Sequence, residues 1–298
     1  MAVGNAQLLS QTAVLRWIIE NNPKKLQFLH QFVFNAVDGG ALQVARTDAT
    51  DVAEFVSGGG ALTDQTADIV SPATSFEFAL AATRFRIGSK ALEAYSQPTD
   101  QDAAQAVQAI RRMLYLFAQE CGAVTPDPNG FGSFADLSSR TIDKSAAALA
   151  WADLLDLFYL IDDNEGSPTM IVSDQESQRK GIIAAASGPD NMLTWEPAPW
   201  VSPNGKRPKM PYLMGVPWFI NGLQVPTAGI FAMVNGDSGM GGPGHGLCGI
   251  VPATVADNWF VRREVQVAGD ATTEVQYSWP VGLSLGSKAA MGRLFNFT

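Results

Sequence analysis

The residue types that most often carry chemistry are scarce in this 298-residue sequence. There are two histidines, His30 and His245, and two cysteines, Cys121 and Cys248. Two scattered residues of each kind cannot supply the ligand set of a typical zinc site. Two cysteines are also too few for a disulfide framework, so we expect both thiols to be reduced and buried. The sequence therefore predicts no metal site.

The candidate nucleophile is Ser238, within the glycine-rich string GDSGMGGP at 236–243. The string resembles the GDSGGP signature of chymotrypsin-like serine proteases, where small residues let backbone N–H groups surround the developing oxyanion. Met240 interrupts that signature. A serine hydroxyl also needs a positioned imidazole, whereas His30 lies in an amphipathic helical segment and His245 stands among glycines. We favour a glycine-rich loop between two strands, and a serine hydrolase acting through Ser238 is the alternative from a different class.

Other candidate strings indicate no site. Asp153 and Asp156 stand three residues apart and would share a helix face, where solvated side chains are favoured over a carboxylate pair. The DDNEG turn at 162–166 lacks the alternating oxygen ligands of a calcium loop. No GxxxxGK[ST] phosphate loop is present, and no dinucleotide fingerprint follows a strand. We therefore expect no catalytic residue and no cofactor.

Charge and hydropathy argue against two classes of protein. Charged residues make up 16% of the chain and the net charge is −9, whereas a general nucleic-acid binder would be basic. No apolar run approaches the roughly 18 residues of a membrane helix, so no membrane is expected as a partner. The amino terminus does not have the pattern of a signal peptide. A chain this poor in charge is expected to bury surface against other copies of itself.

The most regular element is a helix at 99–122. Its apolar residues recur at spacings of four and three and trace one stripe: Ala103, Val107, Ile110, Leu114, Phe117 and Cys121. Thr99 or Asp100 can cap its start, Gly122 is expected to adopt the left-handed conformation, and Pro126 blocks continuation. We expect the stripe to pack on strands from the distant carboxyl-terminal part of the chain.

The part before this helix is low in core residues. Residues 1–38 predict two short helices, and 41–92 predict an extended hairpin with strands in ALQVAR and SFEFALAATRFRIG. Its tip contains Gly58, Gly59 and Gly60 and has too few apolar residues for a core of its own. The hairpin is therefore expected to lie on a neighbouring subunit.

The part after the helix is a mixture of helices and strands. Asp143 is the expected cap of a second helix that runs to Ile161, and the strand TMIVS precedes a helix with a capping box at Ser173 and Glu176. Short strands follow in MPYLMGVPWFING, IFAMVNGDSGMG, HGLCGIVP, WFVRREVQV and TEVQYSWPVGLSL. These elements indicate the α+β class.

This order of parts resembles the major capsid proteins of tailed bacteriophages, whose Johnson fold is shared with herpesvirus shells and bacterial encapsulins. The resemblance is carried by the arm and hairpin, the helix DAAQAVQAIRRMLYLFAQECG, the step PTMIVSDQESQRKGIIAAA, the G-x-P-v/w turn in LMGVPWFING, and the closing strands. It covers essentially the whole chain and concerns architecture, because the family has no invariant catalytic string.

The resemblance implies four structural parts. They are an N-terminal arm at 1–40, an extended hairpin (E-loop) at 41–92, a peripheral domain from 93–165 and 255–298 with its spine helix at 99–121, and an axial domain at 166–254. The candidate inter-subunit contacts are Gly58, Gly59, Gly60, Phe76, Phe78, Arg84 and Arg86.

The resemblance also implies a function. The subunit would self-assemble into hexamers and pentamers of an icosahedral viral capsid that encloses double-stranded DNA without binding it specifically. The expected partners are other copies of itself, a scaffolding protein, a portal and a decoration protein. Its place would be the capsid shell of the virion, assembled in the host cytoplasm. An encapsulin-type compartment is the alternative within the same fold.

Overall fold

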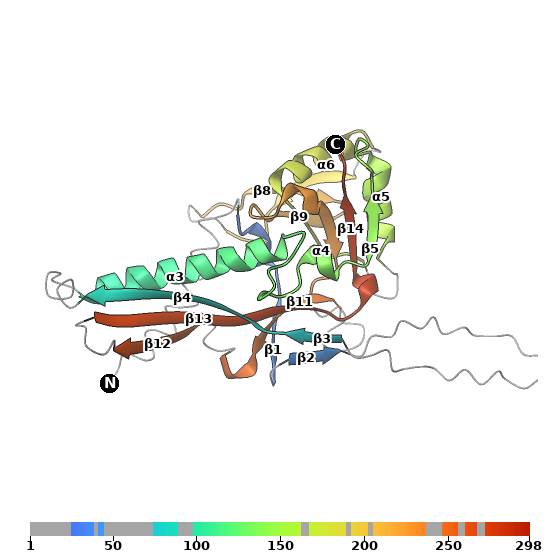
Figure 1. The fold of residues 1–298 in the computed structure, drawn as a ribbon. Coiled ribbons are helices and arrows are strands. Elements are labelled where there is room, and N and C mark those ends of the chain that lie inside the picture. The colour runs from blue at the N-terminus through green and yellow to red at the C-terminus, as the bar shows by residue number, and fades with distance from the viewer. Residues whose placement is uncertain are drawn as a thin grey trace, which may run out of the picture.

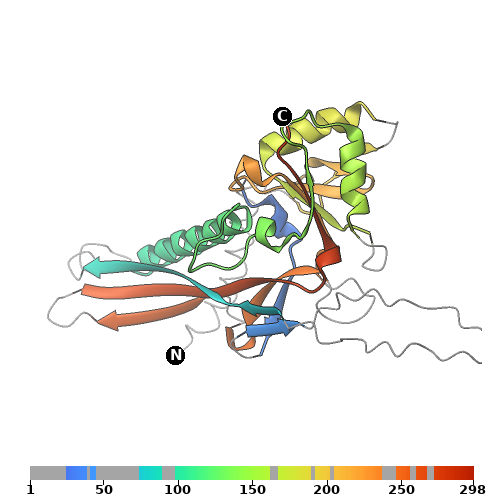
Figure 2. The ribbon, with the colours of Figure 1, turned by 45° about the vertical axis from the view of Figure 1, so that its right-hand side comes forward.

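The computed structural model describes residues 25–38, 41–44, 74–88, 98–161, 167–188, 192–201, 205–236, 246–255, 260–266 and 272–298. Two sheets and one long helix organise them (Figure 1). Figures 1 and 2 both show α3 running alongside β4 and β13, while α5, α6 and β14 lie together near the C-terminus. The molecule therefore has an elongated part and a second part built on another sheet.

The elongated part is a five-stranded sheet. Its strands follow the order β1 (Phe34–Val37), β11 (Leu247–Pro252), β13 (Thr272–Leu285) and β12 (Val261–Gln266), and β4 (Ala79–Gly88) also pairs with β13. β4 runs antiparallel to β13 over ten residue pairs. Alternate side chains of β13 are buried, as a strand with one face on a core requires: Val275, Tyr277, Trp279 and Val281. A separate two-stranded sheet pairs β2 (Ala41–Val44) with β3 (Thr74–Glu77).

The second part is a seven-stranded sheet. Its order is β5 (Arg140–Asp143), β14 (Met291–Phe295), β10 (Ile230–Met233), β6 (Met170–Ser173), β9 (Val216–Ile220), β8 (Lys209–Leu213) and β7 (Leu193–Pro197). Every residue of β6 and β10 is buried, which is expected of central strands covered on both faces. The helices α5 (Trp151–Tyr159) and α6 (Gln175–Ala186) pack on this sheet, and the short helix α4 (Phe134–Leu137) precedes β5 in the chain. Single 3-10 turns occur at η1 (Gln27–His30), η3 (Pro226–Ala228), η4 (Ala253–Val255) and η5 (Lys288–Ala290).

The helix predicted at 99–122 is confirmed as α3 (Pro98–Cys121). Its stripe packs as expected on the carboxyl-terminal strand β13, where the rings of Phe117 and Trp279 lie 5.3 Å apart. The prediction for Gly122 is wrong, because this glycine does not have a left-handed φ. A side chain there would instead come within 2.4 Å of the Cα of Gln224. Glycine is needed at the end of α3 because another segment passes too close for a Cβ atom.

Three local predictions are corrected by the structure. The second helix of the arm is only the η1 turn, after which the chain enters β1. Asp143 caps no helix: it ends β5, and its carboxylate accepts hydrogen bonds from the Ser145 N–H (2.7 Å) and the Asn296 amide (2.9 Å). The cap of α6 is Asp174, whose carboxylate accepts two backbone N–H bonds. Ser173, the expected cap, instead accepts a hydrogen bond from the Trp218 indole at 2.9 Å.

The predicted strands are present, and the G-x-P-v/w string makes a tight turn. Met214 (φ 51°) and Gly215 (φ 81°) join β8 to β9, with Leu213 opposite Val216. Two successive positive φ values are what a two-residue type I′ hairpin requires. The strands of the predicted extended hairpin occur as β2, β3 and β4, while its tip lies outside the described residues.

Sheet membership divides the chain differently from the expected domain ranges. β5, α5 and β14 belong to the seven-stranded part, although their residues fall within the ranges expected for the peripheral domain. β11 falls within the range expected for the axial domain but pairs with β13 in the five-stranded sheet. The domain boundaries themselves stay a prediction.

A charged side chain introduced on the buried side of α3 should destabilise the protein far more than one introduced on the exposed side. Leu114 is buried, so Leu114→Asp should cost several kcal/mol and abolish folding. Leu116 is half exposed, so Leu116→Asp should leave the subunit folded. Circular dichroism and urea unfolding of both variants measure the difference. Equal stabilities of the two variants would contradict the burial of the Leu114 side chain.

Candidate assembly surfaces

The described residues contain no recognisable catalytic centre. They include no group of three or more His, Cys, Asp or Glu side chains close enough to hold a metal ion. Ser238 and His245 lie outside the described residues. His30 stacks on Trp200, with ring centroids 4.4 Å apart and planes 3° from parallel. No described helix combines the length and apolar character that a membrane-spanning segment needs.

The carboxylate pair considered on α5 does not form a joint site. Asp153 is buried and forms an ion pair with Lys144 at 2.7 Å, and it also accepts the Ala150 N–H at 2.8 Å at the start of the helix. Asp156 is exposed. The solvated interpretation therefore holds for Asp156, whereas Asp153 ties the start of α5 to the preceding loop.

Both thiols are buried and free, as expected. Burial raises the pKa of the Cys121 thiol well above its ordinary value, and the nearby Glu120 carboxylate adds to the rise. The Cys248 sulfur lies 3.1 Å from the Ser284 hydroxyl and accepts a hydrogen bond from the Asn35 amide at 3.4 Å. A thiol that stays protonated in an apolar site is a poor nucleophile, so Cys121 acts as a core side chain. Cys248 is also part of the buried core.

The candidate contact residues on the hairpin strands have different surroundings. Phe76 is buried inside the subunit, with 6% of its surface exposed, and Phe78 packs partly buried against the same core. Arg84 is exposed and lies 3.7 Å from Glu274 across the strand pair, while the backbone of Arg86 is in register with that of Glu274. Of these four residues, Arg84 is the one whose described side chain is available to another subunit. Gly58, Gly59 and Gly60 lie outside the described residues.

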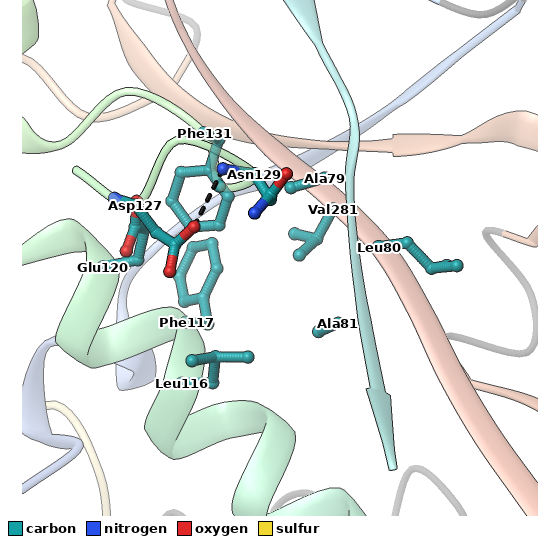
Figure 3. Close-up of a pocket in the computed structure, with 11 residues that line it drawn as sticks. Ala79, Leu80, Ala81, Leu116, Phe117, Glu120, Asp127, Asn129, Phe131 and Val281 are labelled. Atoms are coloured by element: carbon teal, nitrogen blue, oxygen red, sulfur yellow. Dashed lines mark hydrogen bonds between the residues drawn. The ribbon is translucent and has the colours of Figure 1, made fainter.

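A groove between α3 and β4 was not anticipated from the sequence. It holds about 210 Å³, and its walls come from α3, β4, β13 and the loop after α3. Figure 3 shows Leu116 and Phe117 on one side and Ala79, Ala81 and Val281 on the other, with Leu80 pointing away from the helix. The small alanines leave the space open. The sequence signal that could have revealed it is Leu116, an apolar residue on the otherwise polar side of the helix.

One end of the groove is acidic. The Glu120 carboxylate is 8% exposed and accepts a hydrogen bond from the Asp127 N–H at 2.8 Å. Asp127 in turn accepts the Asn129 N–H at 2.8 Å (Figure 3). Within the described part of the chain neither carboxylate has an ion-pair partner. Burial raises the pKa of Glu120, and the charge of Asp127 raises it further against the lowering effect of the backbone hydrogen bond.

The exposed surface also carries separate apolar side chains. Leu80 and Leu116, at the groove, are 62% and 50% exposed, and further large apolar residues on other elements are Tyr159, Ile183 and Trp195. Scattered apolar side chains are normal on a soluble protein, but a groove lined by them is a candidate contact surface.

Comparison with known proteins identifies solved structures that share this architecture. No protein-family model and no curated protein matches the sequence. The SrpI encapsulin complex from Synechococcus elongatus matches with a TM-score of 0.66 and 15% identity, over 91% of this chain and 87% of that one. The capsid of an empty GTA particle matches with a TM-score of 0.62 and 14% identity, over 91% of this chain and 90% of that one. The satellite phage P4 procapsid matches with a TM-score of 0.52 and 11% identity, over 97% of this chain and 99% of that one.

The chain has the Johnson fold. This confirms the fold expected from the order of its parts, including the α+β class and the long spine helix. In each comparison the match covers at least 87% of both chains. At sequence identities of 11–15%, the similarity to these structures is a similarity of fold alone.

The acidic end of the groove gives a prediction for pH dependence. The native carboxyl of Glu120 has a pKa above its ordinary value of 4.5, so the native state holds this proton more tightly than the unfolded state does. Its contribution to stability is therefore complete below pH 4.5 and is lost as pH rises through the raised pKa. Glu120→Gln keeps the oxygen that accepts the Asp127 N–H.

We expect Glu120→Gln to have a larger free energy of unfolding than the wild type at pH 7, with the difference shrinking as pH falls below 4.5. Urea unfolding across this range measures it. Asp156→Asn, which removes an exposed negative charge on α5, is the control. A destabilising effect of Glu120→Gln at pH 7 would show that the charged carboxylate stabilises the fold.

Proposed function

We propose that this protein is the structural subunit of an icosahedral viral capsid, in which hexamers and pentamers enclose double-stranded DNA. The observation that carries the proposal is the Johnson fold, shared over about nine-tenths of the chain with an encapsulin complex and with the capsid of a GTA particle. The elongated α3–β4–β13 part and its apolar groove supply surface for contacts between subunits. The acidic net charge of −9 suits a wall that must not hold its genome electrostatically.

The proposal assigns roles to the two sheets. The five-stranded sheet with α3 forms the peripheral domain, and the seven-stranded sheet forms the axial domain that points to the capsomer centre. Relative to the ranges 93–165, 255–298 and 166–254, this assignment moves β5, α5 and β14 to the axial domain and β11 to the peripheral domain. β1 and β4 fall within the ranges 1–40 and 41–92 but belong to the five-stranded sheet. The remaining parts of the arm at 1–40 and of the E-loop at 41–92 are proposed to reach over neighbouring subunits.

The proposed partners are other copies of the chain, a scaffolding protein, a portal and a decoration protein, and the proposed place is the virion shell. Two similar structures support accessory partners: the satellite phage P4 procapsid includes a size-determination protein, and a phage G structure combines major capsid proteins with decoration proteins. The subunit itself is proposed to have no enzymatic activity.

An encapsulin-type compartment is the second candidate, favoured by the similarity to the SrpI encapsulin complex. The two functions differ in what the shell contains. Particles purified from the natural source should contain nuclease-protected double-stranded DNA if the shell is a capsid. A packaged enzyme without protected DNA would instead favour the compartment.

Purified protein should form capsomers or closed particles that are visible by negative-stain electron microscopy. A shell subunit has large surfaces that are covered only by its neighbours, so association should increase with protein concentration. A monomer that persists at high concentration, in both sedimentation velocity and micrographs, would contradict the proposal.

Deletion of Gly58, Gly59 and Gly60 should leave the subunit folded and impair closure of the shell. The tip is proposed to contact neighbouring subunits and to contribute nothing to the core. Circular dichroism tests folding, and micrographs count closed particles. Loss of soluble folded protein would show that the tip stabilises the subunit itself.

A serine hydrolase acting through Ser238 requires a reactive hydroxyl. We expect a fluorophosphonate probe to label the wild type no more than Ser238→Ala. Stoichiometric labelling that disappears in Ser238→Ala would overturn the non-enzymatic assignment.

A further inference from the structure

One side of α3 carries three residues spaced by four: Arg112 and Leu116, which are exposed, and Glu120, which is 8% exposed and lies at the end of the groove. Residues four apart lie above one another on a helix, so these side chains form a short stripe along one side. The stripe begins with a cation, continues with a half-exposed leucine and ends with a carboxylate at the groove. Its ends are therefore opposite in charge, with an apolar residue at the centre.

Among the described residues, neither charged end of this stripe has an ion-pair partner. In the described part of the chain Arg112 is exposed and forms no ion pair. Glu120 also has no ion-pair partner there, and Asp127 adds a second negative charge beside it. A lone acidic or basic partner would complement only one end of the stripe. A second copy in the reversed direction would complement both ends at once.

The spacing makes the reversed arrangement symmetric. Leu116 lies four residues from each charged side chain, which is about 6 Å along the helix axis on either side. If two α3 helices run antiparallel with Leu116 facing Leu116 of the partner subunit, Arg112 lies opposite Glu120 of the partner subunit, and the converse pair forms as well. An interface in which the same patch meets itself is isologous and has a twofold axis.

We propose that α3 forms a twofold contact between two copies of this chain, centred on Leu116. Leu116 of the partner subunit covers the apolar groove beside α3, where Ala79, Ala81 and Val281 leave space. Arg112 of each copy pairs with the acidic groove end of the other. This inference rests on the proposed shell function. A contact this small is weak by itself, and it becomes effective when many copies of it act together in a closed particle.

Disulfide cross-linking tests the contact directly. A cysteine in place of a residue near a twofold axis meets its own copy, so Leu116→Cys should give a disulfide-linked dimer on a non-reducing gel after oxidation with copper–phenanthroline. The native thiols Cys121 and Cys248 are buried and should give little background. Tyr159→Cys, at a 74% exposed position on α5, is the matched control and should give little dimer.

The charge pairing is tested in the Leu116→Cys background. Adding Arg112→Glu places like charges opposite each other, so the dimer yield should fall several-fold. Adding Glu120→Gln to that variant removes the repulsion and should restore part of the yield. An unchanged yield with Arg112→Glu would overturn the pairing of Arg112 with the acidic groove end.

Electron microscopy of the same samples separates this inference from the proposed function. Particles built from Leu116→Cys subunits that give no more dimer than Tyr159→Cys would overturn the twofold contact and leave the shell function standing. Dimers formed by a protein that builds no particles would support the contact and contradict the shell function.

Discussion

A continuous cluster of aromatic rings holds the two sheets in one arrangement. Phe117 of α3 lies 5.3 Å from Trp279 of β13 and 6.1 Å from Phe32, measured between ring centroids. Phe134 lies 6.3 Å from Phe32 and 5.7 Å from Phe231 of β10, in the seven-stranded sheet. Aromatic pairs at such distances add about 0.5–1.5 kcal/mol each beyond the area that they bury. Because the rings interlock across both sheets, α3 has a fixed position relative to the seven-stranded part.

Buried polar groups reinforce the same junction. The Asn221 amide donates to the Ala118 carbonyl at 2.7 Å, and the Val225 N–H donates to the Gly122 carbonyl at 3.1 Å. These bonds join the end of α3 to the segment that follows β9. Rings along its length and hydrogen bonds at its end therefore hold α3 in one orientation relative to the seven-stranded sheet.

The sequence predicted the elements whose signals are local. The α3 stripe is visible because Ile110, Leu114 and Phe117 repeat with the period of a helix. The role of Gly122 was misjudged because its constraint comes from Gln224, a hundred residues away. The start of α5 was misplaced because Asp143 can cap a helix in principle, whereas pairing with β14 draws it into a strand. The groove was missed because three separate segments form its walls, and no periodicity in one segment indicates their meeting.

The strand order of the seven-stranded sheet has a consequence for synthesis of the chain. β14 lies between β5 and β10, although it begins 58 positions after the end of β10, the strand of this sheet that precedes it in the sequence (291 against 233). Until those residues leave the ribosome, β5 has no strand beside it and one edge of β10 stays unpaired. The five-stranded sheet waits similarly for β13, which pairs with three other strands. Contacts so distant in sequence form slowly. A nascent chain therefore cannot complete either sheet before β13 and β14 have been synthesised.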